Sequence, residues 1–230
     1  MISNYMLPLI TLCMAFVLGR AHAQSEDAAH GPYGFIRLMN AVSQGTGKLD
    51  ILIDGIPVRA EGYQLGDMTG GIPLRPKSYN IEIRREGVKK GVTKVDASNN
   101  DTTTLIPFAE LIPARDERPA YWEIHILKLK QFDPESKRTA SFISVSAEPE
   151  LKVEIQQSDD KWEPVFVKRL GVARTNIKQS HGYLAIRCKD RNLKAMSIAP
   201  SGNFVCVLYD DENGVVQSEA FIDYKYLSPD

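Results

Sequence analysis

The chain has 230 residues, of which 43% are apolar and 25% are charged, and its formal net charge is −1. These values are ordinary for a soluble globular protein and leave room for one large domain or two small ones. They argue against a basic nucleic-acid-binding protein and against a highly charged disordered chain, so we expect no nucleic-acid partner.

The first 23 residues differ in kind from the rest of the chain. An apolar run occupies residues 7–18, and the small-x-small sequence Ala21-His22-Ala23 follows it. This pattern predicts a secretory signal peptide, residues 1–23, cut between Ala23 and Gln24, although no Lys or Arg precedes the apolar run. A membrane anchor is the alternative, but the run is shorter than the roughly 20 residues that span a bilayer. We therefore expect an exported protein, periplasmic or else extracellular, with no transmembrane anchor after cleavage.

Two cysteines remain after this cleavage, Cys188 and Cys206. A pair of cysteines in an exported chain predicts one disulfide bond. The alternative is two buried free thiols, because free cysteine is among the most buried residue types.

The remaining chain is a series of short apolar–polar alternations separated by Gly, Pro, Asn and Asp, which is typical of half-buried antiparallel strands. In Tyr79–Ile83 every second residue is apolar, and Asp54-Gly55 and Asn213-Gly214 are hairpin signals. The main expected strands are Phe35–Asn40, Leu49–Ile53, Tyr79–Ile83, Val92–Val95, Thr103–Ile106, Tyr121–Leu129, Phe204–Tyr209 and Val215–Ile222.

The same landmarks occur a second time, in the same order, about a hundred residues later. Phe142-Ile143 matches Phe35-Ile36, and Tyr183 matches Tyr79. We therefore predict an all-β fold of two antiparallel, immunoglobulin-like β-sandwich domains that arose by internal duplication. The expected division is a flexible leader (24–31), domain 1 (32–112), a Pro-rich charged linker (113–118) and domain 2 (119–227).

No enzyme or metal-binding motif stands out. The sequence lacks a Gly-x-Ser-x-Gly elbow, and His30, His125 and His181 have no partner at metal-ligand spacing. We expect no catalytic residue, no metal ligand and no cofactor, and hence a protein that is not an enzyme; an enzyme with an unrecognised site is the remaining possibility.

Two further features allow a binding role. Trp122 and Trp162 are candidate sugar-stacking platforms, although packing in a core is the commoner fate of tryptophan. The sequence Asp210-Asp211-Glu212 could hold calcium, but the spacing of a calcium loop is missing, which favours a solvated hairpin turn.

The first half also carries a residue series that resembles a known domain. It consists of Phe35-Ile36-Arg37-Leu38-x-Asn40-Ala41, Leu49-Asp50-Ile51-x-Ile53-Asp54-Gly55, Leu65-Gly66 and Leu74-x-Pro76-x-Ser78-Tyr79-x-Ile81-x-Ile83. The series resembles an exported bacterial β-sandwich domain of unknown function. As a two-domain exported chain, the protein is similar to the AlgF family of alginate biosynthesis proteins.

This resemblance implies a non-catalytic periplasmic accessory protein of polysaccharide O-acetylation or export. Its partners would be an envelope polysaccharide or proteins of the acylation machinery. The matching residues are strand starts and turns, so the resemblance implies no site residue. A structural or adhesion module without a pathway of its own is the alternative.

Overall fold

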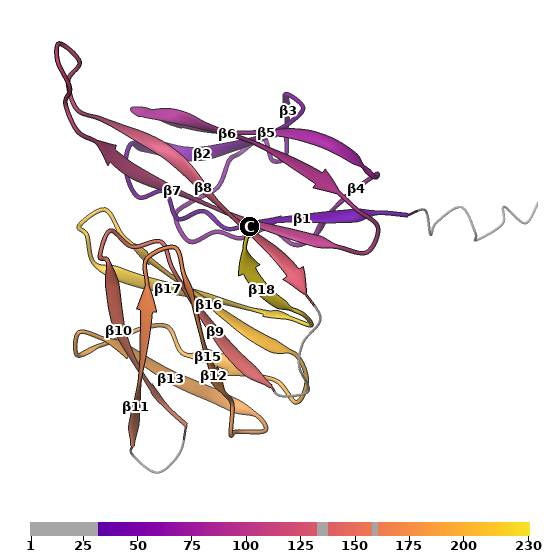
Figure 1. Cartoon of the computed structure of the whole chain (residues 1–230), viewed down its shortest axis with the longest axis vertical. Helices are drawn as coiled ribbons and strands as arrows, with labels where there is room; N and C mark the ends of the chain where they lie inside the picture. Colours follow the sequence, from indigo (N-terminus) through magenta and orange to yellow (C-terminus); the bar gives the residue numbers. More distant parts are fainter. Residues whose placement is uncertain (1–31, 133–137, 158–160) are drawn as a thin grey trace, which may run out of the picture. The chain divides into compact units, whose positions relative to one another are not determined.

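The computed structural model describes residues 32–132, 138–157 and 161–230, which form an all-β protein (Figure 1). The expected signal peptide, its cleavage site at Ala23 and Gln24, the leader 24–31 and His30 lie outside the described residues. Within the described ranges we find no helix, and hence none that is long and apolar enough to cross a membrane.

The first half of the described chain forms one curled sheet. Its strand order is β3-β2-β5-β6-β8-β7-β1-β4, and the last strand of the chain, β18 (Tyr226–Pro229), pairs with β8. The strands are β1 (Gly34–Leu38), β2 (Thr46–Ile53), β3 (Ile56–Pro57), β4 (Ile72–Leu74), β5 (Lys77–Glu86), β6 (Val88–Ala97), β7 (Thr102–Ile112) and β8 (Tyr121–Phe132).

Alternation in the sequence explains how this sheet builds its core. Tyr79, Ile81 and Ile83 of β5 are buried, while the residues between them face outward or are half-buried, as the period of two predicts. They pack with Ile36 and Ile51, from β1 and β2, in the first hydrophobic cluster. The curled sheet therefore encloses its own apolar interior.

The second half forms two smaller sheets around a second cluster. Their orders are β11-β10-β13-β14, with β15 beside β13, and β12-β9-β16-β17. Phe142 and Phe204 are fully buried in the cluster that these sheets share. The strands are β9 (Thr139–Ser144), β10 (Glu150–Gln156), β11 (Trp162–Lys168), β12 (Val172–Asn176), β13 (Gly182–Cys188), β14 (Arg191–Asn192), β15 (Met196–Ile198), β16 (Asn203–Asp210) and β17 (Val216–Asp223).

A third hydrophobic cluster joins the two halves. Ile106 of β7 and Leu129 of β8 pack there with Ile143 of β9 and with Val205 and Val207 of β16. Strand β16 is therefore buried on both faces, since its alternate residues belong to the second cluster. This explains why its sequence is a continuous apolar run and not an alternation.

The strand pairings of the two halves follow the same order. Strand β1 pairs antiparallel with β4 and parallel with β7, and β9 pairs antiparallel with β12 and parallel with β16. Strand β2 lies between β3 and β5, as β10 lies between β11 and β13.

Residues 113–118, expected as a linker, lie at the tip of a long hairpin. Strands β7 and β8 pair antiparallel from Ile112 opposite Tyr121 to Thr104 opposite Leu129, and an isolated bridge joins Arg115 to Arg118. Strand β8 thus lies in the first sheet and not at the start of the second half. Pro and charged residues are as suitable for a hairpin tip as for a linker, so composition does not separate the two.

The expected disulfide bond is absent, because Cys188 and Cys206 are both buried with free thiols. Cys188 pairs across strands with Val153 and Arg191, whereas Cys206 pairs with Phe142 and Ala220. The two cysteines thus belong to different sheets, and in the core each is surrounded by apolar side chains. The structure instead shows the alternative, which is two buried free thiols.

Candidate functional site

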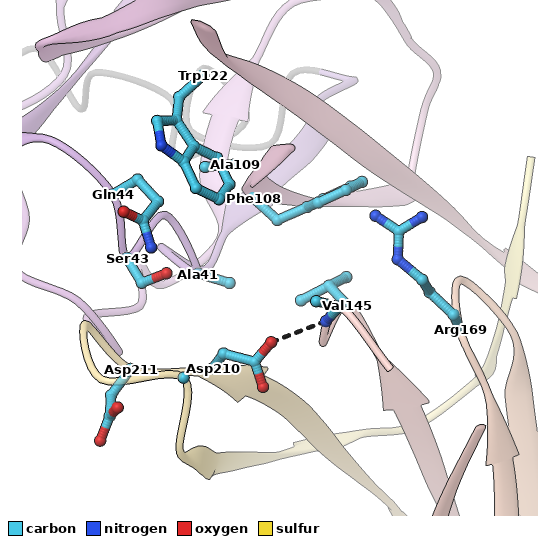
Figure 2. A pocket seen from close by; sticks show the side chains of 12 residues that line it. Ala41, Ser43, Gln44, Phe108, Ala109, Trp122, Val145, Arg169, Asp210 and Asp211 are labelled. Atoms are coloured by element: carbon cyan, nitrogen blue, oxygen red, sulfur yellow. Dashed lines mark hydrogen bonds between the residues drawn. The ribbon is translucent and has the colours of Figure 1, made fainter. Parts of the chain in front are cut away.

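A hollow of about 170 Å³ lies where the first half meets the second (Figure 2). The first half contributes the connection after β1, strand β7 and strand β8. The second half contributes the segments after β9 and β11 and the turn between β16 and β17. The lining residues are Ala41, Ser43, Gln44, Phe108, Ala109, Trp122, Val145, Ala147, Arg169, Asp210, Asp211 and Gly214.

Trp122 supplies the largest aromatic surface of the hollow. It is half-buried in β8, opposite Leu111 of β7, near the end of the paired region. Figure 2 shows its ring on one side of the hollow, with Asp210 and Asp211 on the other. One of the two candidate tryptophans therefore faces polar groups across a gap and is not enclosed in a core.

Asp210 is held in place by two hydrogen bonds. Its Oδ1 accepts a hydrogen bond from Ser146 Oγ at 2.7 Å, and its Oδ2 accepts one from the Ala147 backbone N–H at 2.7 Å. The carboxylate is thus fixed by the segment that follows β9. Each oxygen still has a lone pair available for a ligand, since a carboxylate has about four acceptor positions.

Asp211 is bound more completely by its own turn. Its Oδ1 accepts hydrogen bonds from the backbone N–H groups of Asn213 and Val215, and its Oδ2 accepts one from Gln217 Nε2, all at 2.9 Å. These bonds, the one from Val215 above all, hold the pKa of Asp211 below its ordinary value. The carboxylate closes the β16–β17 hairpin.

Across the described ranges no three His, Cys, Asp or Glu side chains gather in a way that could hold a metal ion.

Arg169 lies at the margin of the hollow with its charge compensated. Its guanidinium is 3.3 Å from Glu110 Oε1, and its Nε donates a hydrogen bond to the Ser146 carbonyl at 3.1 Å. The guanidinium also lies 5.6 Å from the centre of the Phe108 ring. The hollow is therefore lined by two carboxylates and by no unpaired cation.

The described histidines lie apart from each other. His125 Nε2 is 3.8 Å from Glu110 Oε2, and the His125 ring is 5.9 Å from that of Phe108. His181 is exposed and contacts Ser180 Oγ at 2.8 Å. The His181–Ser180 contact joins two neighbouring residues on the exposed surface.

Trp162 belongs to a different surface. It is half-buried in β11, and the Arg187 guanidinium lies 4.2 Å from the centre of its ring. Arg187 is in turn bound by Glu154, with Nε 2.7 Å from Oε2. One face of the Trp162 ring is thus covered by a fixed cation, which makes Trp122 the better platform.

No pattern in the sequence indicated Phe108, Arg169 or Gln44 as members of this site. Arg169 precedes Leu170, which adopts a left-handed conformation with φ of 58° and donates its N–H to the Ser144 carbonyl at 2.7 Å. A non-glycine residue in this region of φ is uncommon and cannot be read from a single sequence.

The hollow thus combines an aromatic ring with fixed hydrogen-bond acceptors. No family model matches this chain, and no curated protein matches it.

Proposed function

We propose that this chain is a non-catalytic binding protein that holds a short glycan segment in the hollow beside Trp122. The single observation that carries the proposal is the position of the Trp122 ring and the fixed Asp210 carboxylate on opposite sides of the hollow. A sugar ring has an apolar face that packs on an aromatic side chain, and its hydroxyl groups donate hydrogen bonds to fixed acceptors.

Charge narrows the class of glycan. Asp210 and Asp211 bring negative charge to the hollow, and Glu110 compensates the nearby Arg169. A uronate bound there would place a third carboxylate near two others, which electrostatics disfavours. The proposed ligand is therefore an uncharged sugar unit, so the polysaccharide that we propose for this hollow is not one built from uronates alone.

The biological setting that we propose is an accessory role in O-acetylation or export of an envelope polysaccharide, as in the AlgF family, with the protein in the periplasm. Support comes from the residue series that starts at Phe35 and from the signal-like sequence of residues 1–23. Partners would be the polysaccharide itself and proteins of the acylation machinery. Resemblance is a weaker kind of support than geometry, so the hollow is the part of the proposal to test first.

We further propose that each half is an immunoglobulin-like sandwich and that the halves arose by duplication. The shared order of pairings supports this, since β1, β4 and β7 recur as β9, β12 and β16 with the same directions. A structural or adhesion module remains the second candidate function. The third hydrophobic cluster favours this second candidate, because a continuous apolar contact holds the two halves together.

Isothermal titration of the purified chain with neutral and uronate oligosaccharides tests the proposal. We expect saturable binding of a neutral oligosaccharide, and at least a tenfold loss of affinity in Trp122→Ala, which corresponds to about 1.4 kcal/mol. Trp162→Ala is the matched control and should bind as the parent does. Absence of binding to any glycan, together with unchanged polysaccharide acetylation in a strain that lacks the gene, would leave the structural module as the better account.

A further inference from the structure

A second hollow, of about 380 Å³, opens between the edge strands β3 and β4 of the first sheet. Its walls are mainly apolar, and one ion pair is the charged part of the lining. The lining residues are Ile53, Asp54, Ile56, Pro57, Val58, Ile72, Leu74, Lys77 and Tyr79. Hollows of this size and polarity are typical of small-molecule sites.

The apolar side chains at this hollow are poorly covered by the protein itself. Ile56 is 71% exposed, and Val58, Ile72 and Leu74 are half-buried. Single exposed apolar residues are common, but several that converge on one concave surface indicate a binding site.

The corresponding edge strands of the second half are arranged differently. There the edge strands β11 and β12 pack against each other, whereas β3 and β4 are not in comparable contact. The physical reason is length, because β11 has seven residues and β3 has only two, Ile56 and Pro57.

Proline prevents strand β4 from accepting an added strand. Gly34 and Ile36 of β1 face β4, while Phe35 donates its N–H to the Asp101 carbonyl on the other side. Pro73, opposite Phe35, therefore turns its backbone toward the free edge of β4. Proline has no N–H to donate, so this edge cannot continue a hydrogen-bonded ladder.

Strand β3 is blocked in the same way. Ile56 pairs with Ile53 across the turn, and Val58 donates its N–H to the Ile51 carbonyl at 2.9 Å. Pro57, between them, turns toward the free edge of β3. Since both edges carry proline at the outward position, the occupant of the hollow is not a peptide strand that pairs with them.

The charged groups at the hollow favour an anionic head group. Lys77 Nζ lies 2.9 Å from Asp54 Oδ2 and 4.4 Å from the centre of the Tyr79 ring. Asp54 Oδ1 accepts a hydrogen bond from the Asn80 N–H at 2.9 Å, so Asp54 stays in place whatever Lys77 binds. An ammonium has three donors, which leaves two for a ligand.

We propose that this hollow binds the alkyl chain of a single-chain anionic amphiphile, with its carboxylate at Lys77. The apolar walls take the chain, which gains free energy in proportion to the apolar area that leaves water. The Lys77 ammonium takes the head group.

The test is titration of the full chain with dansylated undecanoic acid, followed by displacement with laurate. We expect saturable binding with one site per chain, below the concentration at which the probe forms micelles. Val58→Phe, which fills the hollow, should weaken binding by about tenfold or more. Ile56→Asn, at an exposed position where folding is not at risk, should weaken it severalfold and serves as the second variant.

Head-group recognition has its own control. Lys77→Gln should weaken binding of laurate severalfold and leave binding of the neutral dodecanol unchanged, whereas Lys94→Gln, on β6, should change neither. The proposal is overturned if the probe does not saturate, if both Val58→Phe and Ile56→Asn bind as the parent does, or if the hollow takes an apolar peptide in preference to the amphiphile. None of these results bears on the glycan hollow at Trp122, so each of the two proposals is tested independently of the other.

Discussion

Arg37 of β1 and Asp223 at the end of β17 form a largely buried ion pair, with Nη1 2.8 Å from Oδ2, although 186 residues separate them in the sequence. Asp223 is 2% exposed, and its Oδ1 also accepts hydrogen bonds from Gln131 Nε2 at 2.7 Å and from the Lys225 N–H at 3.0 Å. Gln131 in turn accepts the Thr102 N–H at 3.0 Å. One carboxylate thus links the start of the first sheet, strand β8 and the end of the chain.

Removal of this carboxylate should destabilise the protein strongly. Asp223→Ala leaves the Arg37 guanidinium without its anion and Gln131 without its acceptor. Loss of one partner of a buried pair costs about 3 kcal/mol, which we expect in the free energy of unfolding measured with urea. The control is Glu61→Ala, which breaks the exposed pair with Arg59 and should leave that free energy nearly unchanged. Equal effects of the two variants would show that the buried pair adds no stability.

A glycine at the contact between the halves should be equally sensitive. Gly66 has φ of 84°, and a Cβ built on it would lie 2.7 Å from Tyr209 Oη. Gly66→Ala combines backbone strain with a clash against β16, so we expect a loss of about 2 kcal/mol or more on urea unfolding.

Gly47→Ala is the control that tests backbone strain without a steric clash. Its φ is 70°, but a Cβ there meets nothing within 4 Å, so Gly47→Ala should cost only about 1 kcal/mol. If Gly66→Ala is no worse than Gly47→Ala, the approach of Tyr209 does not restrict position 66.

Local patterns in the sequence were enough to predict the all-β fold and many of the strands. Burial of Tyr79, Ile81 and Ile83 confirms the alternation in β5, and β8 has buried residues on both faces, Ile124 and Leu129, as its mixed pattern indicates. These features depend only on near neighbours along the chain, which is why one sequence contains them.

Matching of single residues between the halves was less successful. Tyr79 is buried, with its hydroxyl donating to the Arg75 carbonyl at 3.0 Å, whereas Tyr183 is 73% exposed. The two tyrosines therefore do not occupy equivalent positions. A shift of one residue moves a side chain to the other face of a strand, and similarity of residue type cannot detect such a shift.

The candidate site was predicted only in part, through Trp122. Its other members come from five separate segments, and their approach depends on how the third hydrophobic cluster packs. Such long-range packing leaves no periodic signal in the sequence. The prediction of a disulfide was wrong for the same reason, because the spacing of Cys188 and Cys206 in the sequence does not show in which sheets they lie.

The two thiols should resist modification in the native protein. Burial raises the pKa of Cys206 to about 12 and also raises the pKa of Cys188. Only the thiolate reacts with Ellman's reagent, so at about pH 8 we expect negligible reaction of a folded chain from which residues 1–23, and with them Cys13, have been removed. In urea without reductant both thiols should react. Reaction of neither in urea would show that Cys188 and Cys206 form a disulfide after all.

The turn between β16 and β17 predicts how the stability of the fold depends on pH. Because hydrogen bonds, chiefly from Val215, lower the pKa of Asp211 in the folded state, its carboxylate stabilises the fold above its unfolded pKa of about 3.9. That stabilisation is lost as pH falls through the lower folded pKa. The Tm difference between the parent and Asp211→Asn should therefore be largest near neutral pH and should shrink between about pH 5 and pH 2. Glu212→Gln, at the exposed next position, controls for the general loss of one negative charge. A Tm difference that stays constant with pH, or that Glu212→Gln reproduces, would rule out the turn bonds as the cause.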